Sequence, residues 1–452
     1  MTMAEMRTNS FINGEWVGSS SQIDVLNPAT GKSLASVANA SIADCLRAVD
    51  AADEAFDAWK NTAPRVRGEI LRKAFEIMMA EQEQLARLIT LEMGKILADS
   101  RAEVAYAAEF FRWFSEEAVR IDGDYRRAPG GANWLMVSRQ PVGVALLATP
   151  WNFPAAMATR KIGPALAAGC TVVLKPAQDT PLTALAIADV LQRAGVPAGV
   201  VNVVVTNPSG PAVAAMMDSG KVRKLSFTGS TKVGSILLAQ AAPRVINCSM
   251  ELGGNAPFLV FGDANIDAAV DGAMLAKMRN GGAACTAANR FYVHSSVLAE
   301  FTDKLTARMS ALVLGDGLDA QTTLGPLVSR AEQESVAAMV NGAVSRGAKV
   351  LCGGKAVTSP AFGFQATVLA DVAPDDEILK DEIFGPVVTL QAFDSEDEAV
   401  NIANNIDYGL SATIWSNDTE KSNRVASNIN AGVIWINCWL VRDLRTPFGG
   451  MK

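Results

Sequence analysis

The chain of 452 residues is long enough for about three domains with large cores. Charged residues make up 19% and the formal net charge is −7, which predicts no basic surface for nucleic acid. The N-terminus has neither an apolar signal core nor an arginine-rich leader, and the apolar runs fall short of the roughly 18 residues that span a bilayer, so we expect a soluble cytoplasmic protein without membrane contact.

The first pattern along the chain is helical. Apolar residues recur at helical spacing through residues 41–120, as in Ala48, Ala52, Ala55 and Trp59. From residue 142 the pattern changes to short apolar runs that alternate with helix-length segments. Strands are expected at 142–148, 171–174, 200–205, 224–227 and 245–250, with helices at 182–193, 212–217 and 232–241. This alternation predicts a parallel sheet with helices on both faces, whereas residues 121–139 fit neither pattern.

A second α/β series occupies the rest of the chain. Strands are expected at 256–261, 291–294, 387–393, 411–415 and 433–437, with helices between them and an apolar, helical stretch at 264–280. No fixed-period repeat or low-complexity linker separates the two series. The predicted fold class is therefore α/β.

Cys285 is the residue that indicates chemistry most directly. It lies in a glycine turn after the stretch at 264–280, and because an unactivated thiol is only a few per cent ionised at pH 7, a nucleophilic Cys285 needs a base or an electropositive pocket. Glu251, among apolar and glycine residues, is the candidate base. A small buried hydrophobe is the alternative for Cys285 and the expectation for the other five cysteines, which form no Cys-x-x-Cys pair. The only histidine is His294, so no metal site is expected.

Three further motifs are each compatible with an ordinary structural role. Gly229 and Ser230 follow a predicted strand and open a helix, where backbone N–H groups can hold a pyrophosphate, although a plain helix N-terminus is the alternative. Lys175 ends a predicted strand, where ligands bind in open α/β sheets, or it is a solvated lysine. Asn152 lies between two prolines, and its amide is either an oxyanion donor or a turn residue.

Together these motifs resemble the aldehyde dehydrogenase superfamily. The resemblance rests on Pro-Trp-Asn-Phe-Pro at 150–154, Phe-Thr-Gly-Ser-Thr at 227–231, Glu-Leu-Gly-Gly at 251–254 and Glu-Ile-Phe-Gly-Pro at 382–386, in this order around a cysteine. It extends over almost the whole chain. The fold that it implies is a Rossmann-type cofactor domain, an α/β catalytic domain and a small β oligomerisation element.

The resemblance also implies how the chain is divided. Residues 1–121 and 142–250 would form the cofactor domain, residues 251–440 the catalytic domain, and residues 122–141 with 441–452 the oligomerisation element of a homodimer or homotetramer. Relatives continue beyond the position of Lys452 with a glycine-rich loop and a strand that pairs with a partner subunit, so this element is expected to be incomplete here.

The catalytic roles follow from the same resemblance. Cys285 would attack the aldehyde, Asn152 and the Cys285 backbone N–H would stabilise the oxyanion, and Glu251 would activate the water that releases the acid from a thioester. The cofactor, NADP or NAD, would be held at its riboses by Lys175 and Glu382, at its pyrophosphate by Gly229 and Ser230, and in its cleft by Trp151 and Phe384. Many NAD-preferring relatives carry a glutamate at the position of Gln178 that would repel a 2′-phosphate, so NADP is the expected preference.

The substrate expectation comes from three arginines. Residues 145–180 and the run at 289–294 are most similar to succinate-semialdehyde dehydrogenases, in which arginines at the positions of Arg160 and Arg279 bind the distal carboxylate. Arg442 matches muconic-semialdehyde dehydrogenases instead. Phe153 and Phe448 would line the same funnel. The expected reaction is oxidation of succinate semialdehyde to succinate. The alternatives are a muconic-type semialdehyde, a coenzyme-A-acylating dehydrogenase and a catalytically silent binding protein on this fold.

Overall fold

The computed structural model describes residues 6–439, 441 and 443–452, which fold as two compact units. The first unit comprises the described chain up to Leu26, Ser33–Glu92 and Ser100–Met250. The second comprises Asn27–Lys32, Met93–Asp99 and the chain from Glu251 onward. No helix within the described residues is both long enough and apolar enough to cross a membrane.

The first unit is built on a seven-stranded sheet in the order β11-β10-β7-β8-β9-β1-β2. Its centre is parallel, because β7 pairs in parallel with β8 and β10, and β8 with β9, while β1 runs antiparallel to both β9 and β2 at one edge. The α/β prediction is confirmed, and all five strands expected between residues 142 and 250 are present. The strands are β1 (Ser10–Ile12), β2 (Glu15–Val17), β7 (Val144–Ala148), β8 (Thr171–Lys175), β9 (Val201–Val203), β10 (Val222–Thr228) and β11 (Asn247–Glu251).

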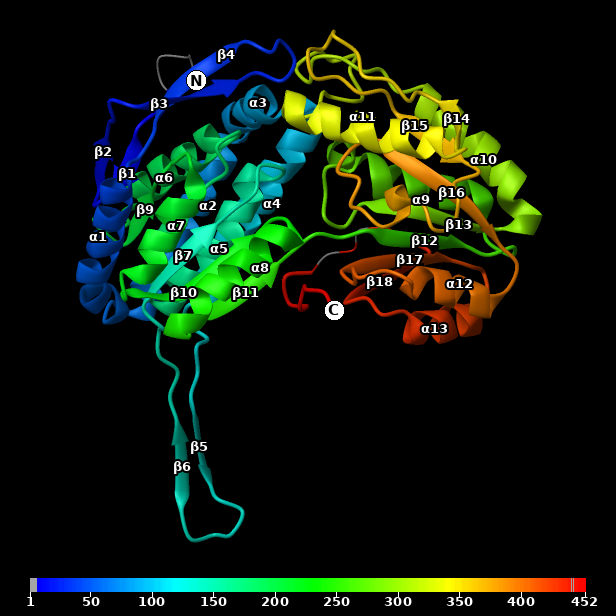
Figure 1. Ribbon diagram of the computed structural model, residues 1–452. Coiled ribbons are helices and arrows are strands. Elements are labelled where there is room, and N and C mark those ends of the chain that lie inside the picture. Colours follow the sequence, from blue (N-terminus) through cyan, green and yellow to red (C-terminus); the bar gives the residue numbers. More distant parts are fainter. Residues whose placement is uncertain (1–5, 440, 442) are drawn as a thin grey trace. The chain divides into compact units, whose positions relative to one another are not determined.

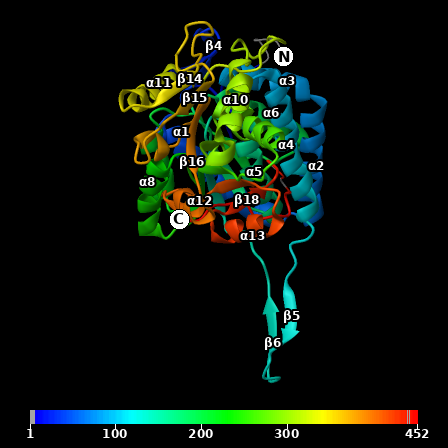
Figure 2. The same cartoon turned by 90° about the vertical axis from the view of Figure 1, so that its right-hand side faces the viewer.

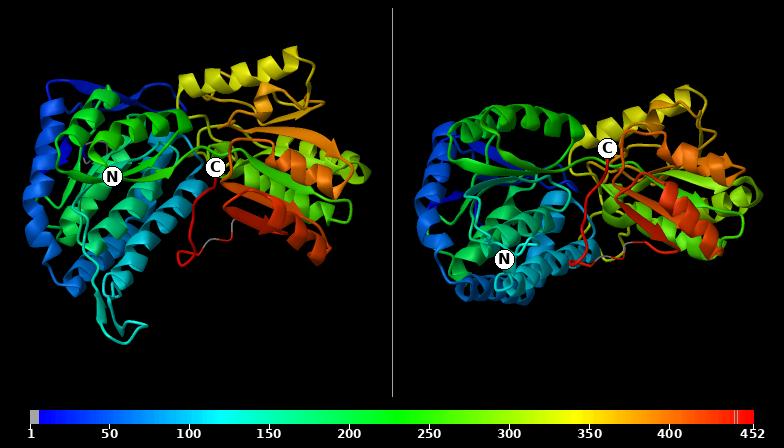
Figure 3. Two further views of the ribbon diagram at one scale, coloured as in Figure 1. Left: turned by 60° about the horizontal axis from the view of Figure 1, so that its bottom comes forward. Right: turned by 90° about the horizontal axis from the view of Figure 1, so that it is seen from below.

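Helices cover both faces of this sheet, as Figure 1 and Figure 3 show. Helices α1, α7 and α8 pack on one face and α2, α5 and α6 on the other. The helical pattern expected at 41–120 corresponds to the first four helices. The helices are α1 (Ile42–Lys60), α2 (Pro64–Ala80), α3 (Gln82–Met93), α4 (Leu97–Glu117), α5 (Pro154–Ala168), α6 (Pro181–Ala194), α7 (Ser209–Asp218) and α8 (Thr231–Ala241), with the 3₁₀ turn η2 (Ala242–Arg244).

Two hairpins lie outside the main sheet. One pairs β3 (Gln22–Leu26) with β4 (Ser33–Ala38). The other pairs β5 (Asp124–Arg127) with β6 (Trp134–Val137), the segment that fitted neither sequence pattern, and it projects from the first unit as a long arm (Figures 1 and 2). Every residue of β5 and β6 is exposed. The arm therefore lacks the packing that stabilises the rest of the unit, and an isolated two-stranded hairpin is at best marginally stable in water.

The second unit has its own seven-stranded sheet in the order β14-β15-β16-β13-β12-β17-β18. All neighbouring pairs are parallel except β14 with β15, which is antiparallel. The strands expected at 387–393 and 411–415 match the observed bounds, whereas β14 and β15 were not expected from the sequence. The strands are β12 (Ala256–Val260), β13 (Ala288–His294), β14 (Lys349–Cys352), β15 (Thr367–Ala370), β16 (Val387–Phe393), β17 (Ser411–Trp415) and β18 (Val433–Ile436).

An aromatic core joins this sheet to its helices. Phe258 stacks on Phe291 with ring centroids 4.8 Å apart, and both belong to a buried cluster with Phe301 of α10 and Trp415 of β17. Burial of each large aromatic side chain stabilises the fold by about 1.5–3 kcal/mol. The helices and 3₁₀ turns of the unit are α9 (Ile266–Met278), η3 (Arg279–Gly282), α10 (Ser295–Ser310), α11 (Arg330–Ser345), η4 (Glu377–Leu379), α12 (Glu396–Asn404) and α13 (Thr419–Asn428).

Candidate active site

The polar motifs of the first unit meet at the carboxyl edge of its sheet. In the register of the three adjacent strands β10, β7 and β8, Phe227 lies opposite Ala148, and Ala148 lies opposite Lys175. The three strands therefore end at the same level of the sheet. The segments that follow them, 150–154, 227–231 and the loop after Lys175, begin side by side at this edge. This is the edge at which ligands bind in open parallel sheets.

Asn152 is held directly before helix α5. Its side chain is 4% exposed, Phe153 is the N-cap residue of α5, and Pro154 occupies the first helical position, where the lack of an N–H costs nothing. The buried carboxylate of Glu103 accepts hydrogen bonds from the backbone N–H groups of Ala155 at 2.9 Å and Ala156 at 3.2 Å. A carboxylate at a helix N-terminus also interacts favourably with the helix dipole, so Glu103 anchors the turn that follows Asn152.

Lys175 ends β8 as the sequence predicts. Its Nζ donates to the Ser209 hydroxyl at the start of α7, at 3.1 Å. Burial lowers the pKa of Lys175, and the Asp179 carboxylate opposes that shift. Gln178, in the loop between them, is exposed. Trp151 approaches the same loop, since its carbonyl accepts a hydrogen bond from the Thr180 hydroxyl at 3.4 Å.

Gly229 and Ser230 connect β10 to α8, again as predicted. Ser230 is the N-cap of α8, and its hydroxyl accepts from the Val233 backbone N–H at 3.4 Å. A cation and the N-terminus of a helix are the donors that phosphate oxygens bind in proteins. The residues present at this edge, Lys175 and the start of α8, therefore fit the phosphate and ribose groups of a dinucleotide.

The polar motifs of the second unit lie at the amino edge of its sheet, directly before the strands. The segment 251–255 precedes β12, the Cys285 turn precedes β13, and the segment 382–386 precedes β16, three adjacent parallel strands. Amino ends of parallel strands lie together at one edge of a sheet. In open α/β sheets, ligands usually bind at the carboxyl ends of the strands. The position of the strands alone would therefore not have predicted a site at this edge, and the sequence motifs were needed to identify it.

Cys285 lies half-buried in the turn between η3 and β13. Asn280, Gly281 and Gly282 precede it with φ values of 57°, 60° and 82°, three consecutive left-handed residues. The Asn280 side chain donates to the Ala283 carbonyl at 2.7 Å, and a Cβ on Gly282 would lie 2.3 Å from the Gly385 carbonyl oxygen. The turn is therefore fixed by its backbone conformation and by the segment that follows Glu382.

The segment 251–255 contacts both Cys285 and Glu382. A Cβ on Gly254 would lie 2.0 Å from the Cys285 carbonyl oxygen, so only glycine fits there. The Gly254 N–H donates to Glu382 Oε1 at 3.0 Å. Asn255 then donates its side-chain amide to the carbonyls of Leu379 and Asp381, at 3.0 and 2.9 Å, and so holds the loop that carries Glu382.

Glu251 is the last residue of β11 and is half-buried. A Cβ on Gly449 would be 3.6 Å from its Oε1 atom, an ordinary van der Waals separation, so the segment 447–450 passes over this carboxylate. Phe448 in that segment is half-buried. Within the second unit, Glu251, Cys285 and Glu382 are thus connected through one short stretch of chain.

Glu382 is a half-buried residue, and the protonation of its carboxylate depends on its surroundings. Burial raises the pKa of Glu382 to about 7, and the Gly254 N–H and the Lys277 ammonium oppose that shift. Phe384, two residues later, is partly buried. An ionised Glu382 would be a strong acceptor for two adjacent hydroxyl groups, which is the hydrogen-bonding pattern of a ribose.

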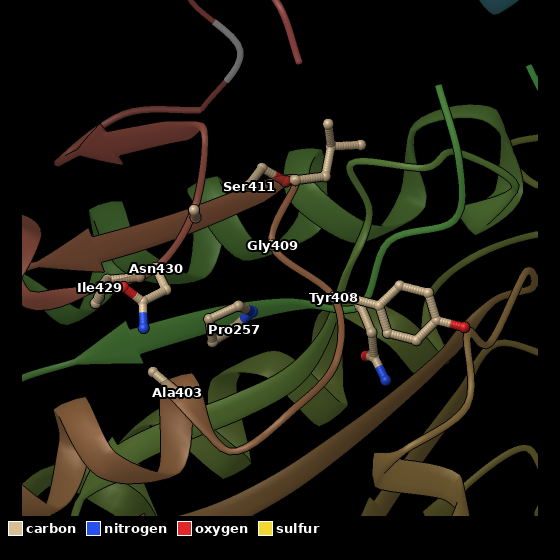
Figure 4. Close-up of a pocket in the computed structure, with 10 residues that line it drawn as sticks. Pro257, Ala403, Tyr408, Gly409, Ser411, Ile429 and Asn430 are labelled. Carbon is tan, nitrogen blue, oxygen red and sulfur yellow. The ribbon is translucent and has the colours of Figure 1, made fainter. Parts of the chain in front are cut away.

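Asn255 also lines a small cavity, and Figure 4 shows other residues that line it, among them Tyr408, Gly409 and Asn430. Its water-accessible volume is about 10 Å³, the room for a single water molecule. The cavity is too small for an organic substrate. We therefore assign it a packing role.

The predicted substrate residues are distributed over both units. Arg160 lies half-buried on α5 with its guanidinium carbon 5.5 Å from the Phe110 ring centroid, and Phe153 is 8% exposed at the start of the same helix. Arg279 begins η3 in the second unit and is half-buried. Arg442 lies outside the described residues.

Other sequence signals have structural roles. His294 ends β13, and its Nδ1 lies 2.8 Å from the Ser296 hydroxyl at the start of α10. Sequence reasoning missed Lys277, Glu103 and Arg290, three charged side chains that are almost completely buried. Arg290 donates to the Asn255 carbonyl at 3.1 Å and so supports the segment 251–255. A charge inside an apolar run, as at Lys277, is the one signal that could have identified them.

The chain is similar in sequence and in structure to known aldehyde dehydrogenases. A family model described as "Aldehyde dehydrogenase family" matches residues 16–452. The chain is 50% identical over 419 residues to a succinate-semialdehyde dehydrogenase of Paenarthrobacter nicotinovorans, covering 93% of each chain. It is 45% identical over 448 residues to the NADP(+) succinate-semialdehyde dehydrogenase of Escherichia coli, over 99% of this chain and 93% of the relative. The solved structure of an E. coli NADP-dependent enzyme matches with a TM-score of 0.97 at 45% identity, over 99% of this chain and 93% of that chain.

Proposed function

The chain belongs to the aldehyde dehydrogenase family, and on that premise we propose that it oxidises succinate semialdehyde to succinate with NADP or NAD. Membership makes the chain an NAD(P)-dependent oxidoreductase. The observation that carries the substrate proposal is the 50% identity, over 93% of the chain, to a relative named for this semialdehyde. The contacts of Cys285 and Glu382 with the segment 251–255 support the assignment of one catalytic centre to these residues.

Cys285 is the proposed nucleophile. Its thiolate forms a bond to the aldehyde carbon, and the electron pair of the C=O bond moves to the oxygen. We assign the stabilisation of this oxyanion to the Cys285 backbone N–H and to the amide of Asn152, which Glu103 anchors through α5. One such donor contributes roughly 10²–10³ in rate.

A nicotinamide cofactor, when bound, would supply the acceptor for the hydride that leaves the aldehyde carbon. We assign Lys175, Gly229 and Ser230 to the binding of its phosphates and adenosine ribose, and Glu382 to its second ribose. Gln178 lacks the negative charge that would repel a 2′-phosphate, and Lys175 supplies a cation, so NADP is the proposed preference. Trp151 and Phe384 are proposed to shape the cofactor cleft.

Glu251 is the proposed base of the second half-reaction. After hydride transfer the acyl group is a thioester on Cys285. Glu251 accepts a proton from water, the water oxygen attacks the thioester carbon, and the C–S bond breaks to release the acid and the thiolate. A water-activating carboxylate favours hydrolysis over transfer to coenzyme A.

The distal carboxylate of the substrate requires a cationic partner. Arg160 and Arg279 are proposed to supply planar, bidentate guanidinium donors, and Phe153 and Phe448 the apolar wall of the funnel. A site built for a carboxylate rejects an uncharged analogue, because its guanidinium groups then lose their partner. The two relatives described above are named for succinate semialdehyde, and this supports succinate semialdehyde over a muconic-type semialdehyde.

The test is an NAD(P)H absorbance assay without coenzyme A. We expect kcat/KM for succinate semialdehyde to exceed that for butanal by at least about a hundredfold, or ~2.7 kcal/mol in transition-state binding. Cys285→Ala should abolish the signal and leave cofactor binding intact. Equal rates on the two aldehydes would contradict the carboxylate proposal. A strict requirement for coenzyme A would contradict the hydrolytic one.

The β5–β6 arm supports a further proposal, that the protein assembles as a homodimer or homotetramer. Tyr125 and Trp134 stack across the hairpin at 5.1 Å but remain 67% and 61% exposed, and Met136 is 81% exposed. Exposed apolar residues of this size are typical of an interface. Six cysteines without a disulfide among the described residues support a reducing compartment such as the cytoplasm. Sedimentation of the protein with and without residues 122–141 tests the assembly.

A further inference from the structure

Lys277 is a buried lysine near the end of helix α9, and it is 1% exposed. Its Nζ donates to the Asn289 side-chain oxygen of β13 at 2.6 Å and to the Ile383 carbonyl at 3.3 Å. The remainder of this helix face is apolar and packs into the core of the second unit. Burial of an ammonium group costs free energy of folding unless charged or polar partners compensate it, so the groups around Lys277 determine whether its charge is tolerated.

Lys277 contacts two segments of the candidate site. Ile383 directly follows Glu382, so the bond to its carbonyl fixes the backbone that presents that carboxylate. A Cβ on Gly282, in the turn before Cys285, would lie 3.1 Å from Lys277 Cε. Lys277 therefore links the Glu382 loop, strand β13 and the nucleophile turn through one side chain.

The charge of Lys277 acts on Glu382. Burial lowers the pKa of Lys277 to about 7, and the attraction of Glu382 opposes that shift. Reciprocally, burial raises the pKa of Glu382, Lys277 opposes the rise, and Glu332 adds to it. Asp381, Asp407 and Tyr408 are further titratable groups around this loop, and Tyr408 interacts with Glu382, Asp381 and Asp407. Lys380 also lies on this loop but is exposed, and Lys277 is the cation whose charge acts on Glu382.

We propose that Lys277 is a positioning residue that keeps Glu382 ionised and its loop in place to accept the ribose hydroxyls of the cofactor. The proposal rests on the role proposed above for Glu382. It extends that role to a residue that touches neither substrate nor cofactor. Asn289 orients the ammonium, and Gly254 completes the hydrogen bonding of the carboxylate.

The experiment compares Lys277→Met, Lys277→Arg, Glu382→Gln and the Lys277→Met/Glu382→Gln double variant. Cofactor Kd is measured by quenching of tryptophan fluorescence in the absence of aldehyde. We expect Lys277→Met to weaken NADP binding about fivefold at pH 7 and nearly tenfold at pH 6, the effect of raising the pKa of Glu382 by about one unit, and Lys277→Arg to recover part of the loss. In the Glu382→Gln background, Lys277→Met should add less than about twofold, because the carboxylate through which it acts is absent.

The pH profile separates this role from a purely structural one. The Kd ratio of Lys277→Met to wild type should shrink as pH rises from 6 to 9, because Glu382 then ionises without help and Lys277 in the wild type loses its proton. Lys421→Met is the matched control, since it removes another lysine of the second unit, one that pairs with Asp263 at 2.9 Å. Its cofactor Kd should equal that of the wild type.

Three outcomes would overturn the proposal. They are an unchanged Kd in Lys277→Met, a pH-independent Kd ratio, and full additivity of the two substitutions. The rate at which iodoacetamide alkylates Cys285 without cofactor, which should stay within about twofold in Lys277→Met, shows whether the nucleophile turn is intact. If Glu382→Gln itself binds NADP as the wild type does, the role proposed for Glu382 fails, and this result is distinct from a failure at Lys277 alone.

Discussion

Replacement of Glu103 by glutamine is expected to lower both stability and turnover. Glu103, on α4, is 1% exposed, and its carboxylate accepts the first two N–H groups of α5 that follow Pro154. These donors lie at the positive end of the helix dipole. Since Asn152 directly precedes this helix, a change in the position of its first turn moves the proposed oxyanion donor.

The magnitude follows from the two hydrogen bonds. A bond to a charged acceptor contributes about 1.5–3 kcal/mol and a neutral one about 0.5–1.5 kcal/mol, so a glutamine of the same shape loses about 2 kcal/mol over both bonds. Glu103→Ala leaves two buried N–H groups without this acceptor, at about 1–3 kcal/mol each, and should cost about 4 kcal/mol. We expect kcat of Glu103→Gln to fall about tenfold, a part of the roughly 10²–10³ that a whole oxyanion donor contributes.

The assay pairs urea unfolding with steady-state kinetics, and Glu92→Gln is the matched control. Glu92 is also fully buried, and it accepts the Leu182 and Thr183 N–H groups at the start of α6, at 2.8 and 2.9 Å. Burial raises the pKa of Glu92 to about 8, so this group is mostly protonated at pH 7 and Glu92→Gln should lose less stability than Glu103→Gln. Because α6 follows the loop after Lys175, Glu92→Gln should act on turnover through KM for the cofactor. A Glu103→Gln variant that is destabilised and yet has the wild-type kcat would refute the link to Asn152. Unchanged free energies of unfolding in both variants would show that the hydrogen bonds from the helix N-termini to these side chains do not stabilise the fold as calculated.

Three further variants test single assignments. Glu251→Gln should release a burst of about one equivalent of NAD(P)H and then stall, because hydride transfer precedes the water step; steady turnover at the wild-type rate would exclude Glu251 as the base. Gln178→Glu should lower kcat/KM for NADP by at least about tenfold with little change for NAD, since it places a negative charge against the 2′-phosphate; an equal effect on both cofactors would contradict this reasoning. Arg279→Ala should raise KM for succinate semialdehyde by about tenfold and leave butanal oxidation unaffected, and a parallel loss on butanal would indicate damage to the turn before Cys285 instead.

Much of the fold follows from local pattern. Strands at 387–393 and 411–415 could be predicted with their bounds, because continuous apolar runs of this length between turn residues are typical of buried parallel strands. The short strands β1, β2, β14 and β15 could not. They have three or four residues each, and pairing with a neighbouring strand, rather than their own composition, makes them strands.

The sequence by itself determined the family and predicted which residues carry the chemistry. A cysteine in a glycine turn, a carboxylate beside two glycines and a lysine at a strand end are local features, and local features can be recognised without a fold. Only the tertiary structure decided which of them touch. Gly254 bonds Glu382 across 128 positions of the chain, and Lys277 bonds the next residue, Ile383, across 106. These contacts exist because the sheet places β12, β13 and β16 side by side, so that the segments before them meet at one edge. Strand order is a property of the whole packed sheet, and no local stretch of sequence encodes it.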